Sequence, residues 1–202
     1  MGILLNSGNT EFEEAVNAEI YVDKTLLIEY ANRVLRTPQK YICVSRPRRF
    51  GKSMAANMLT AYYSKGCDSR ELFSPYKISE SDSFEKHLNK YNVIHINMVE
   101  YLTEAKSIEN LIKYIEDDII GEITDSMPEL VMPRRISLTK VLTSAFNQFK
   151  IPFIFIIDEW DCIFRKSSIR SEEYTAYLDF LRTLLKDQSY VALAYMTGIL
   201  PI

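Results

Sequence analysis

Residues 46–53 read RPRRFGKS and join the apolar stretch YICVS, residues 41–45, to a helical pattern. Gly51, Lys52 and Ser53 match the end of the pattern G-x-x-x-x-G-K-[ST], in which backbone N–H groups surround phosphate oxygens. The N-terminus of the helix that follows favours the same negative charge. The segment therefore predicts a nucleotide phosphate site, with Lys52 reaching the β- and γ-phosphates and Ser53 ligating Mg²⁺.

Arg46 departs from this pattern, because its position normally carries glycine. Its guanidinium, with those of Arg48 and Arg49, would add positive charge near a triphosphate. The alternative is a basic, solvated turn in which Gly51 only supplies a positive φ. The predicted nucleotide contacts are Arg46, Pro47, Arg48, Arg49, Phe50, Gly51, Lys52, Ser53 and Met54.

Two adjacent acids, Asp158 and Glu159, follow the buried-strand pattern FIFII at residues 153–157. Ligands of open α/β sheets bind outside the carboxyl ends of the strands. Asp158 would hold Mg²⁺, usually through water, and Glu159 would orient or deprotonate the attacking water. The alternative is that Asp158 caps the next helix and Glu159 is solvated. Together with the phosphate loop, the pair favours a catalytic site.

Thr197 follows the apolar run VALAYM, residues 191–196, and is the third predicted catalytic residue after Lys52 and Glu159. Its hydroxyl would bond the γ-phosphate or the attacking water, although a threonine before Gly198 is also ordinary turn chemistry. Asp161 either supports the metal or caps a helix. His87 and His95 have no partners at spacings that indicate metal binding or nucleophilic catalysis.

The composition limits the class of protein. With 202 residues, 47% hydrophobic character and a net charge of -3, the chain predicts one soluble domain without an overall positive field for nucleic acid. Cys43, Cys67 and Cys162 lack paired spacing and indicate reduced thiols in the cytoplasm, with Cys43 and Cys162 in the core. The longest apolar stretch, residues 151–157, is too short to span a bilayer, so no membrane contact is expected.

Apolar runs alternate with helical patterns, which predicts an α/β fold built from βαβ units. The predicted strands are parallel and buried on both faces, at residues 41–45, 93–98, 153–157 and 191–196. Three stripes are predicted to face the core: Ile108, Leu111, Ile112, Ile115, Ile119 and Ile123; Leu138, Val141, Leu142, Ala145 and Phe146; Tyr174, Tyr177, Leu178, Leu181, Leu184 and Leu185. Thr25 is expected to cap a helix that runs to about Leu35, and residues 66–92 are expected to form a surface excursion.

Several stretches in one order resemble the predicted AAA-ATPase-like proteins of bacteria, in the additional-strand, catalytic-glutamate (ASCE) branch of the P-loop NTPases. They are YVDKT (21–25), SRPRRFGKS (45–53, the Walker A loop), HLNKYNVIHINM (87–98), IIDEWD (156–161, the Walker B segment) and TGILPI (197–202). Trp160 stands where the family more often has Tyr, and Ile163 where Pro is common. The resemblance implies a three-layer αβα sandwich with a mostly parallel sheet of order 5-1-4-3-2.

The same resemblance implies that residues 1–202 form one AAA-ATPase-like domain, truncated after the fourth strand and belonging to a longer protein. Family members often continue into a C-terminal nuclease-like domain of the PD-(D/E)XK type. An effector domain beyond residue 202, a homo-oligomer and, by family analogy alone, nucleic acid are therefore the expected partners besides the nucleotide. An arginine from a neighbouring subunit would complete such a site, and Arg165, Arg170 and Arg182 are equal candidates.

These observations predict an ATPase that binds ATP and Mg²⁺ and hydrolyses the γ-phosphate. Adenine is favoured by the resemblance and by the lack of an N/T-K-x-D stretch. The alternative is a nucleotide-binding switch with little or no hydrolysis that controls a partner or a nuclease-like domain. A scaffold with a vestigial loop filled by Arg46 and a small-molecule kinase are the less favoured alternatives, since Glu159 beside Asp158 suits the activation of water.

Overall fold

The computed structural model describes residues 2–166 and 169–200. The elements are α1 (Thr10–Val16), α2 (Leu26–Val34), β1 (Tyr41–Ser45), α3 (Lys52–Tyr63), α4 (Arg70–Phe73), the 3-10 helix η1 (Lys77–Glu80), α5 (Phe84–His87), β2 (Asn92–Asn97), α6 (Met98–Glu104), α7 (Ile108–Ser126), α8 (Leu138–Phe149), β3 (Phe153–Asp158), the 3-10 helix η2 (Cys162–Arg165), α9 (Ser171–Leu185) and β4 (Val191–Gly198). The predicted α/β class is confirmed.

One parallel sheet of order β1-β4-β3-β2 forms the centre of the described residues. β4 therefore lies between β1, which leads into the basic loop, and β3, which ends at the two acids. This register places Ser45 opposite Gly198 and Asn97 opposite Asp158. All four strand ends thus meet at one edge of the sheet, and the complete order 5-1-4-3-2 stays a prediction.

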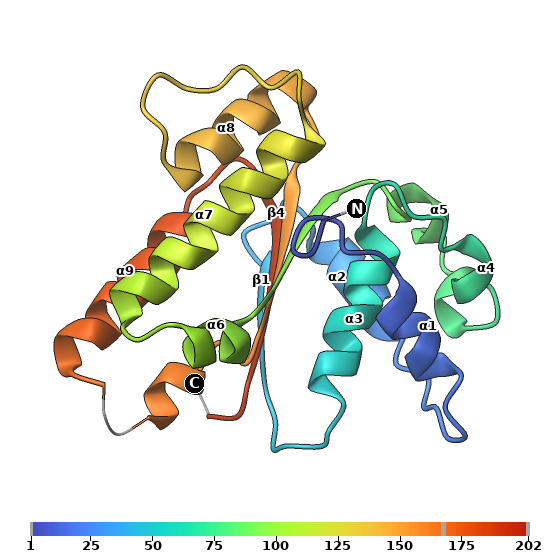
Figure 1. Ribbon diagram of the computed structural model, residues 1–202. Helices are drawn as coiled ribbons and strands as arrows, with labels where there is room; N and C mark the ends of the chain where they lie inside the picture. The colour runs from blue at the N-terminus through green and yellow to red at the C-terminus, as the bar shows by residue number, and fades with distance from the viewer. Residues whose placement is uncertain (1, 167–168, 201–202) are drawn as a thin grey trace.

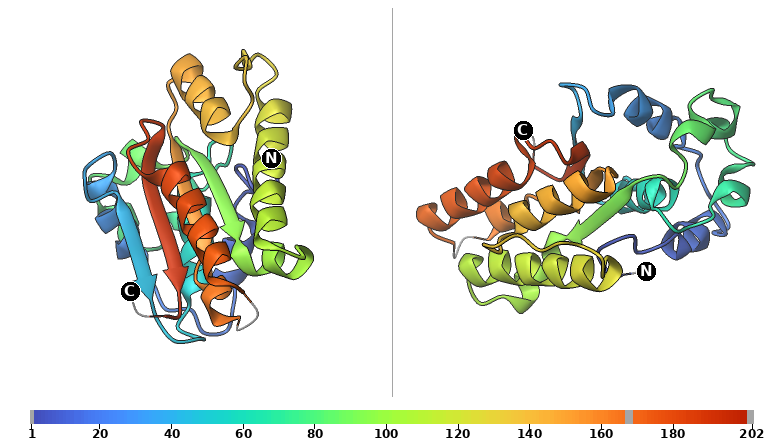
Figure 2. Two further views of the ribbon diagram at one scale, coloured as in Figure 1. Left: turned by 90° about the vertical axis from the view of Figure 1, so that its left-hand side faces the viewer. Right: turned by 90° about the horizontal axis from the view of Figure 1, so that it is seen from above.

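Helices cover both faces of the sheet, and Figures 1 and 2 show α7, α8 and α9 on one side with α1, α2 and α3 on the other. Because side chains alternate along a strand, β3 serves both layers. Ile154 and Ile156 pack in the cluster with α1–α3, whereas Phe155 and Ile157 pack in the cluster with α7–α9. The strand ends that lead into the phosphate loop and the acids are thereby fixed by packed helices on both faces of the sheet.

Strand β1 differs from the prediction that all four strands are buried on both faces. It pairs with β4 alone among the described residues, and Tyr41 is 44% exposed. Cys43 is exposed as well, so its expected place in the core is wrong, whereas Cys162 is buried as expected. An edge strand with the same apolar composition as a central one cannot be distinguished from it by hydrophobicity alone.

The helical stripes on α7 and α8 are confirmed as core faces. On α9, Leu178 is 46% exposed, so that stripe is narrower than predicted. Residues 66–92 are also more ordered than a surface excursion, because α4, η1 and α5 bury Phe73, Ile78 and Phe84 against the layer of α2 and α3. Their helices are only four residues long, too short to produce a clear periodic pattern.

Within residues 2–166 and 169–200, every helix is too short or too polar to span a bilayer.

Candidate functional site

The loop between β1 and α3 takes the backbone shape that its sequence allows. Arg49 and Gly51 have positive φ angles of 68° and 74°, and Arg46 does not. The first loop position therefore does not need the conformational freedom of glycine, which explains how an arginine is accommodated there. The backbone N–H of Arg46 donates to the carbonyl of Gly198 at 3.1 Å and so extends the sheet pairing by one bond.

Lys52 lies at the start of α3 and is 7% exposed. Its ammonium donates to the carbonyl oxygen of Pro47 at 3.1 Å, which holds the charge close to the loop that precedes it. Ser53, one residue on, is exposed toward solvent. The free N–H groups of the helix N-terminus lie beside both side chains, as an anion site requires.

A second segment, YVDKT at residues 21–25, supports the loop from outside. The ammonium of Lys24 donates to the carbonyl of Phe50 at 2.9 Å. Thr25 occupies the position before α2 but makes no capping bond; its N–H and hydroxyl both donate to Asp23. The predicted cap at Thr25 is therefore replaced by a turn built on Asp23. Burial would raise the pKa of Asp23, but the bonds from Thr25 and from the N–H of Lys77 lower it overall.

Asp158 ends β3 and is 5% exposed. Its Oδ1 accepts hydrogen bonds from the N–H of Glu159, at 3.0 Å, and from the hydroxyl of Thr197. Both bonds go to the same oxygen, which leaves Oδ2 available. Thr197 is fully buried, so its hydroxyl is directed at the carboxylate. The expected cap of a following helix by Asp158 is not formed.

Glu159 has a positive φ of 56° and a side chain that is 21% exposed. Its carboxylate forms an ion pair with Arg165, the last residue of η2. The same guanidinium lies 3.7 Å from Asp161. The sequence predicted Glu159 to be either a free base or a solvated side chain. It instead pairs with Arg165 of the same chain.

Asp161 neither caps η2 through its side chain nor faces the phosphate loop. It is fully buried, and its Oδ2 accepts from the N–H groups of Ile199 and Leu200 at 2.8 and 2.7 Å. The hydrogen bond from the N–H of Trp160 to the carbonyl of Thr197, at 3.0 Å, joins the same two segments. Asp161 thus anchors the chain after β4 to the chain after β3.

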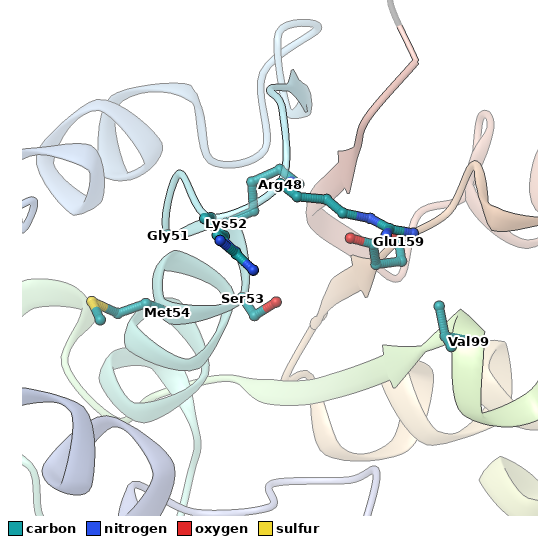
Figure 3. A pocket seen from close by; sticks show the side chains of 8 residues that line it. Arg48, Gly51, Lys52, Ser53, Met54, Val99 and Glu159 are labelled. Carbon is teal, nitrogen blue, oxygen red and sulfur yellow. The ribbon is translucent and has the colours of Figure 1, made fainter.

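A cavity of about 420 Å³ brings the two predicted motifs together. Figure 3 shows Ser53 and Glu159 facing the same space from α3 and from the end of β3, with Arg48 reaching across toward Glu159. The cavity is lined by Arg48, Arg49, Gly51, Lys52, Ser53, Met54, Val99 and Glu159. The predicted contacts Arg46, Pro47 and Phe50 do not line it, and Phe50 is 60% exposed.

The family profile with the description "Predicted AAA-ATPase" matches residues 7–202, which is nearly the whole chain. The chain belongs to this AAA-ATPase-like family. The resemblance drawn from the motifs is thereby confirmed, and the αβα architecture agrees with it. The comparison with curated proteins gave no match.

A second cavity of this AAA-ATPase-like domain, about 310 Å³, opens on the other side of Ser53 and Asp158. His95 lines it, and its Nδ1 lies 3.2 Å from the hydroxyl of Thr60. That hydroxyl already donates its single proton to the carbonyl of Ala56, so it accepts from Nδ1–H of His95. Burial lowers the pKa of His95, although the nearby Asp158 opposes this.

The residues at the strand ends fit Mg²⁺. A serine hydroxyl and a carboxylate with one available oxygen are hard oxygen ligands of the kind that Mg²⁺ prefers. The described part of the chain holds no group of three or more His, Cys, Asp or Glu residues able to bind a metal alone. Mg²⁺ in phosphate-handling sites usually takes one or two protein ligands, with phosphates and water supplying the rest.

The sequence alone did not place Lys24 or His95 beside the site, and it offered Arg165 only as one of three candidate arginines from a neighbouring subunit. Lys24 belongs to the stretch YVDKT, which is part of the family resemblance and so pointed to this segment. Its contact with the phosphate loop depends on tertiary structure and could not be predicted. Arg165 lies six residues after Glu159, and no periodic pattern predicts that a short 3-10 helix turns it back.

Proposed function

We propose that this AAA-ATPase-like domain binds ATP with Mg²⁺ and hydrolyses its γ-phosphate. The observation that supports this most is the shared cavity, in which Lys52 and Ser53 meet Glu159 although more than a hundred residues separate them. A basic solvated turn would have no reason to face a carboxylate at the end of a neighbouring strand. Backbone N–H groups, an ammonium and a hydroxyl on one wall are the donors that a triphosphate requires.

Each residue has one role in the proposed reaction. Lys52 would neutralise charge on the β- and γ-phosphates. Ser53 and Asp158 would hold Mg²⁺, whose charge would favour the negative charge that develops on the phosphate oxygens. Thr197 is a positioning residue, because its hydroxyl orients Asp158. Glu159 accepts a proton from the attacking water while the new O–Pγ bond forms and the bond from Pγ to the bridging oxygen breaks.

The decisive experiment is a calorimetric titration with ATP and with GTP, each with and without Mg²⁺. We expect Mg²⁺-dependent binding of ATP that Lys52→Ala abolishes and Arg134→Ala, which alters an exposed cation between α7 and α8, preserves. A Glu159→Gln variant should bind ATP normally but lose turnover by at least about 100-fold. Equal binding of ATP by the Lys52→Ala variant would exclude the loop as the phosphate site.

A second candidate function is supported by one observation, the ion pair of Glu159 with Arg165. A carboxylate held in an ion pair within the chain is less free to turn toward an attacking water, so hydrolysis in this arrangement would be slow. We propose as the alternative a switch whose nucleotide occupancy controls a partner or a nuclease-like domain. ATP that stays bound without being hydrolysed after gel filtration would favour the switch, and steady turnover would favour the ATPase.

A further inference from the structure

A third cavity, of about 210 Å³, adjoins the proposed phosphate site on the side of Glu159. It shares Arg48, Val99 and Glu159 with that site and extends from there toward η2 and α6. The two cavities therefore meet at the end of the loop where the proposed chemistry takes place. The proposed roles of Lys52, Ser53 and Asp158 do not involve this third cavity.

The charges around this third cavity are predominantly positive. Arg48, Arg165 and Lys166 line it with a single carboxylate, Glu159, and the hydroxyl-bearing Thr103 lies beside them. The side chains that line the cavity thus carry a surplus of two positive charges, and Asp161, which lies outside the lining at 3.7 Å from Arg165, lowers the local surplus to one. Arginine and lysine side chains converging on a small space are the donors that recognise phosphate and similar oxyanions.

Arg165 is only partly satisfied in its present contacts. It pairs with Glu159 and lies 3.7 Å from Oδ1 of Asp161, whereas Oδ2 of Asp161 is held by two backbone N–H groups. The Nε of Arg165 is buried and has no hydrogen-bond partner among residues 2–166 and 169–200. Lys166 holds only a 3.4 Å contact with the carbonyl of Leu102. Nε of Arg165 and the ammonium of Lys166 are therefore available to donate hydrogen bonds to an oxyanion that enters the cavity.

We propose that this cavity is a binding site for inorganic phosphate, held by Arg48, Arg165 and Lys166, next to the nucleotide site. Glu159 already places a carboxylate against Arg165, and a phosphate ion competes with it for the same guanidinium. The role of this site as the place that receives the phosphate product rests on the proposed ATPase function. The binding of phosphate itself does not.

The test is phosphate titration of the nucleotide-free chain by calorimetry and by fluorescence of Trp160, the single tryptophan, which directly follows Glu159. We expect two phosphate ions per wild-type chain and one in Lys52→Ala, which removes the loop site. In that background, Arg165→Ala or Lys166→Ala should weaken the remaining binding at least about tenfold. Arg134→Ala, which changes an exposed cation between α7 and α8 and away from the cavity, should not.

Loss of all phosphate binding in Lys52→Ala, or unchanged binding when both Arg165 and Lys166 are replaced, would overturn the proposal. Lys166 is exposed, so its variant decides the matter if Arg165→Ala does not fold. A chain that binds the second phosphate but never hydrolyses ATP would refute the product role and the ATPase together, and would leave the anion site standing.

Discussion

The hydroxyl of Thr197 donates a hydrogen bond to Oδ1 of Asp158 and so connects the ends of β4 and β3. Thr197 is fully buried and Asp158 is 5% exposed, which makes this a bond inside the protein rather than a contact with solvent. It fixes the plane of the carboxylate and directs the other oxygen, Oδ2, away from the bond. In the proposed reaction, the threonine would therefore act on Mg²⁺ through Asp158.

Replacement of Thr197 by valine tests this relationship. The variant keeps the shape but leaves a buried carboxylate oxygen with one donor fewer, which costs about 1–3 kcal/mol of unfolding free energy. We expect the Mg²⁺ concentration needed for ATP binding to rise about tenfold in Thr197→Val and to stay near normal in Thr197→Ser. Slower turnover at an unchanged Mg²⁺ requirement would instead indicate direct contact with the γ-phosphate.

Gly51 is predicted to be irreplaceable because of its backbone angle. Its φ of 74° costs an alanine about 1–2 kcal/mol, and the added Cβ would lie 2.8 Å from Nζ of Lys24. Since Nζ ends a flexible side chain, it can move away from the added Cβ. The loss of stability therefore comes mainly from the backbone conformation of residue 51 and not from the contact with Lys24. Chemical denaturation should therefore show additive losses for Gly51→Ala and Lys24→Ala. Recovery of stability in the double variant would mean that the steric contact dominates.

The phosphate loop and the two acids were predictable because each follows an apolar strand with a fixed local motif. What could not be predicted from the sequence depends on contacts made across the fold. Arg165 turns back onto Glu159 through a 3-10 helix of four residues, which is too short to show periodicity. Asp161 was expected near a metal or a cap, yet it binds backbone N–H groups almost forty residues away.

Gly198 should resist substitution for a steric reason. A Cβ there would lie 2.9 Å from Cγ of Asp161 and from Nε1 of Trp160. Asp161 is fully buried and held by two backbone bonds, so it cannot move aside. We expect Gly198→Ala to lose about 1–3 kcal/mol in thermal or urea unfolding.

Gly121 on α7 provides the matched control, because a Cβ there meets nothing within 4 Å. Gly121→Ala should stabilise the protein by about 0.5–1 kcal/mol through its better helix propensity. If both alanine variants lost stability equally, the close approach at Gly198 would not be the cause.

His95 should make the stability of the fold sensitive to acid. Burial lowers its pKa, so below the unfolded-state pKa of about 6.5 the unfolded chain binds a proton that the folded chain refuses. The unfolding free energy is then constant above about pH 6.5 for this group and falls as pH drops toward the folded-state pKa, by at most about 1.4 kcal/mol per pH unit.

The check is urea unfolding of the wild type and of His95→Gln from pH 7.5 to 5. Glutamine keeps a hydrogen-bonding group near Thr60 but does not titrate. The unfolding free energy of the variant should therefore decrease less than that of the wild type as the pH falls. His87 has a lowered pKa from burial and nearby lysines, and it contributes with the same sign, so His87→Gln is measured in parallel. Identical slopes in the wild type and His95→Gln would show that His95 titrates alike in the folded and the unfolded chain, and would contradict the prediction.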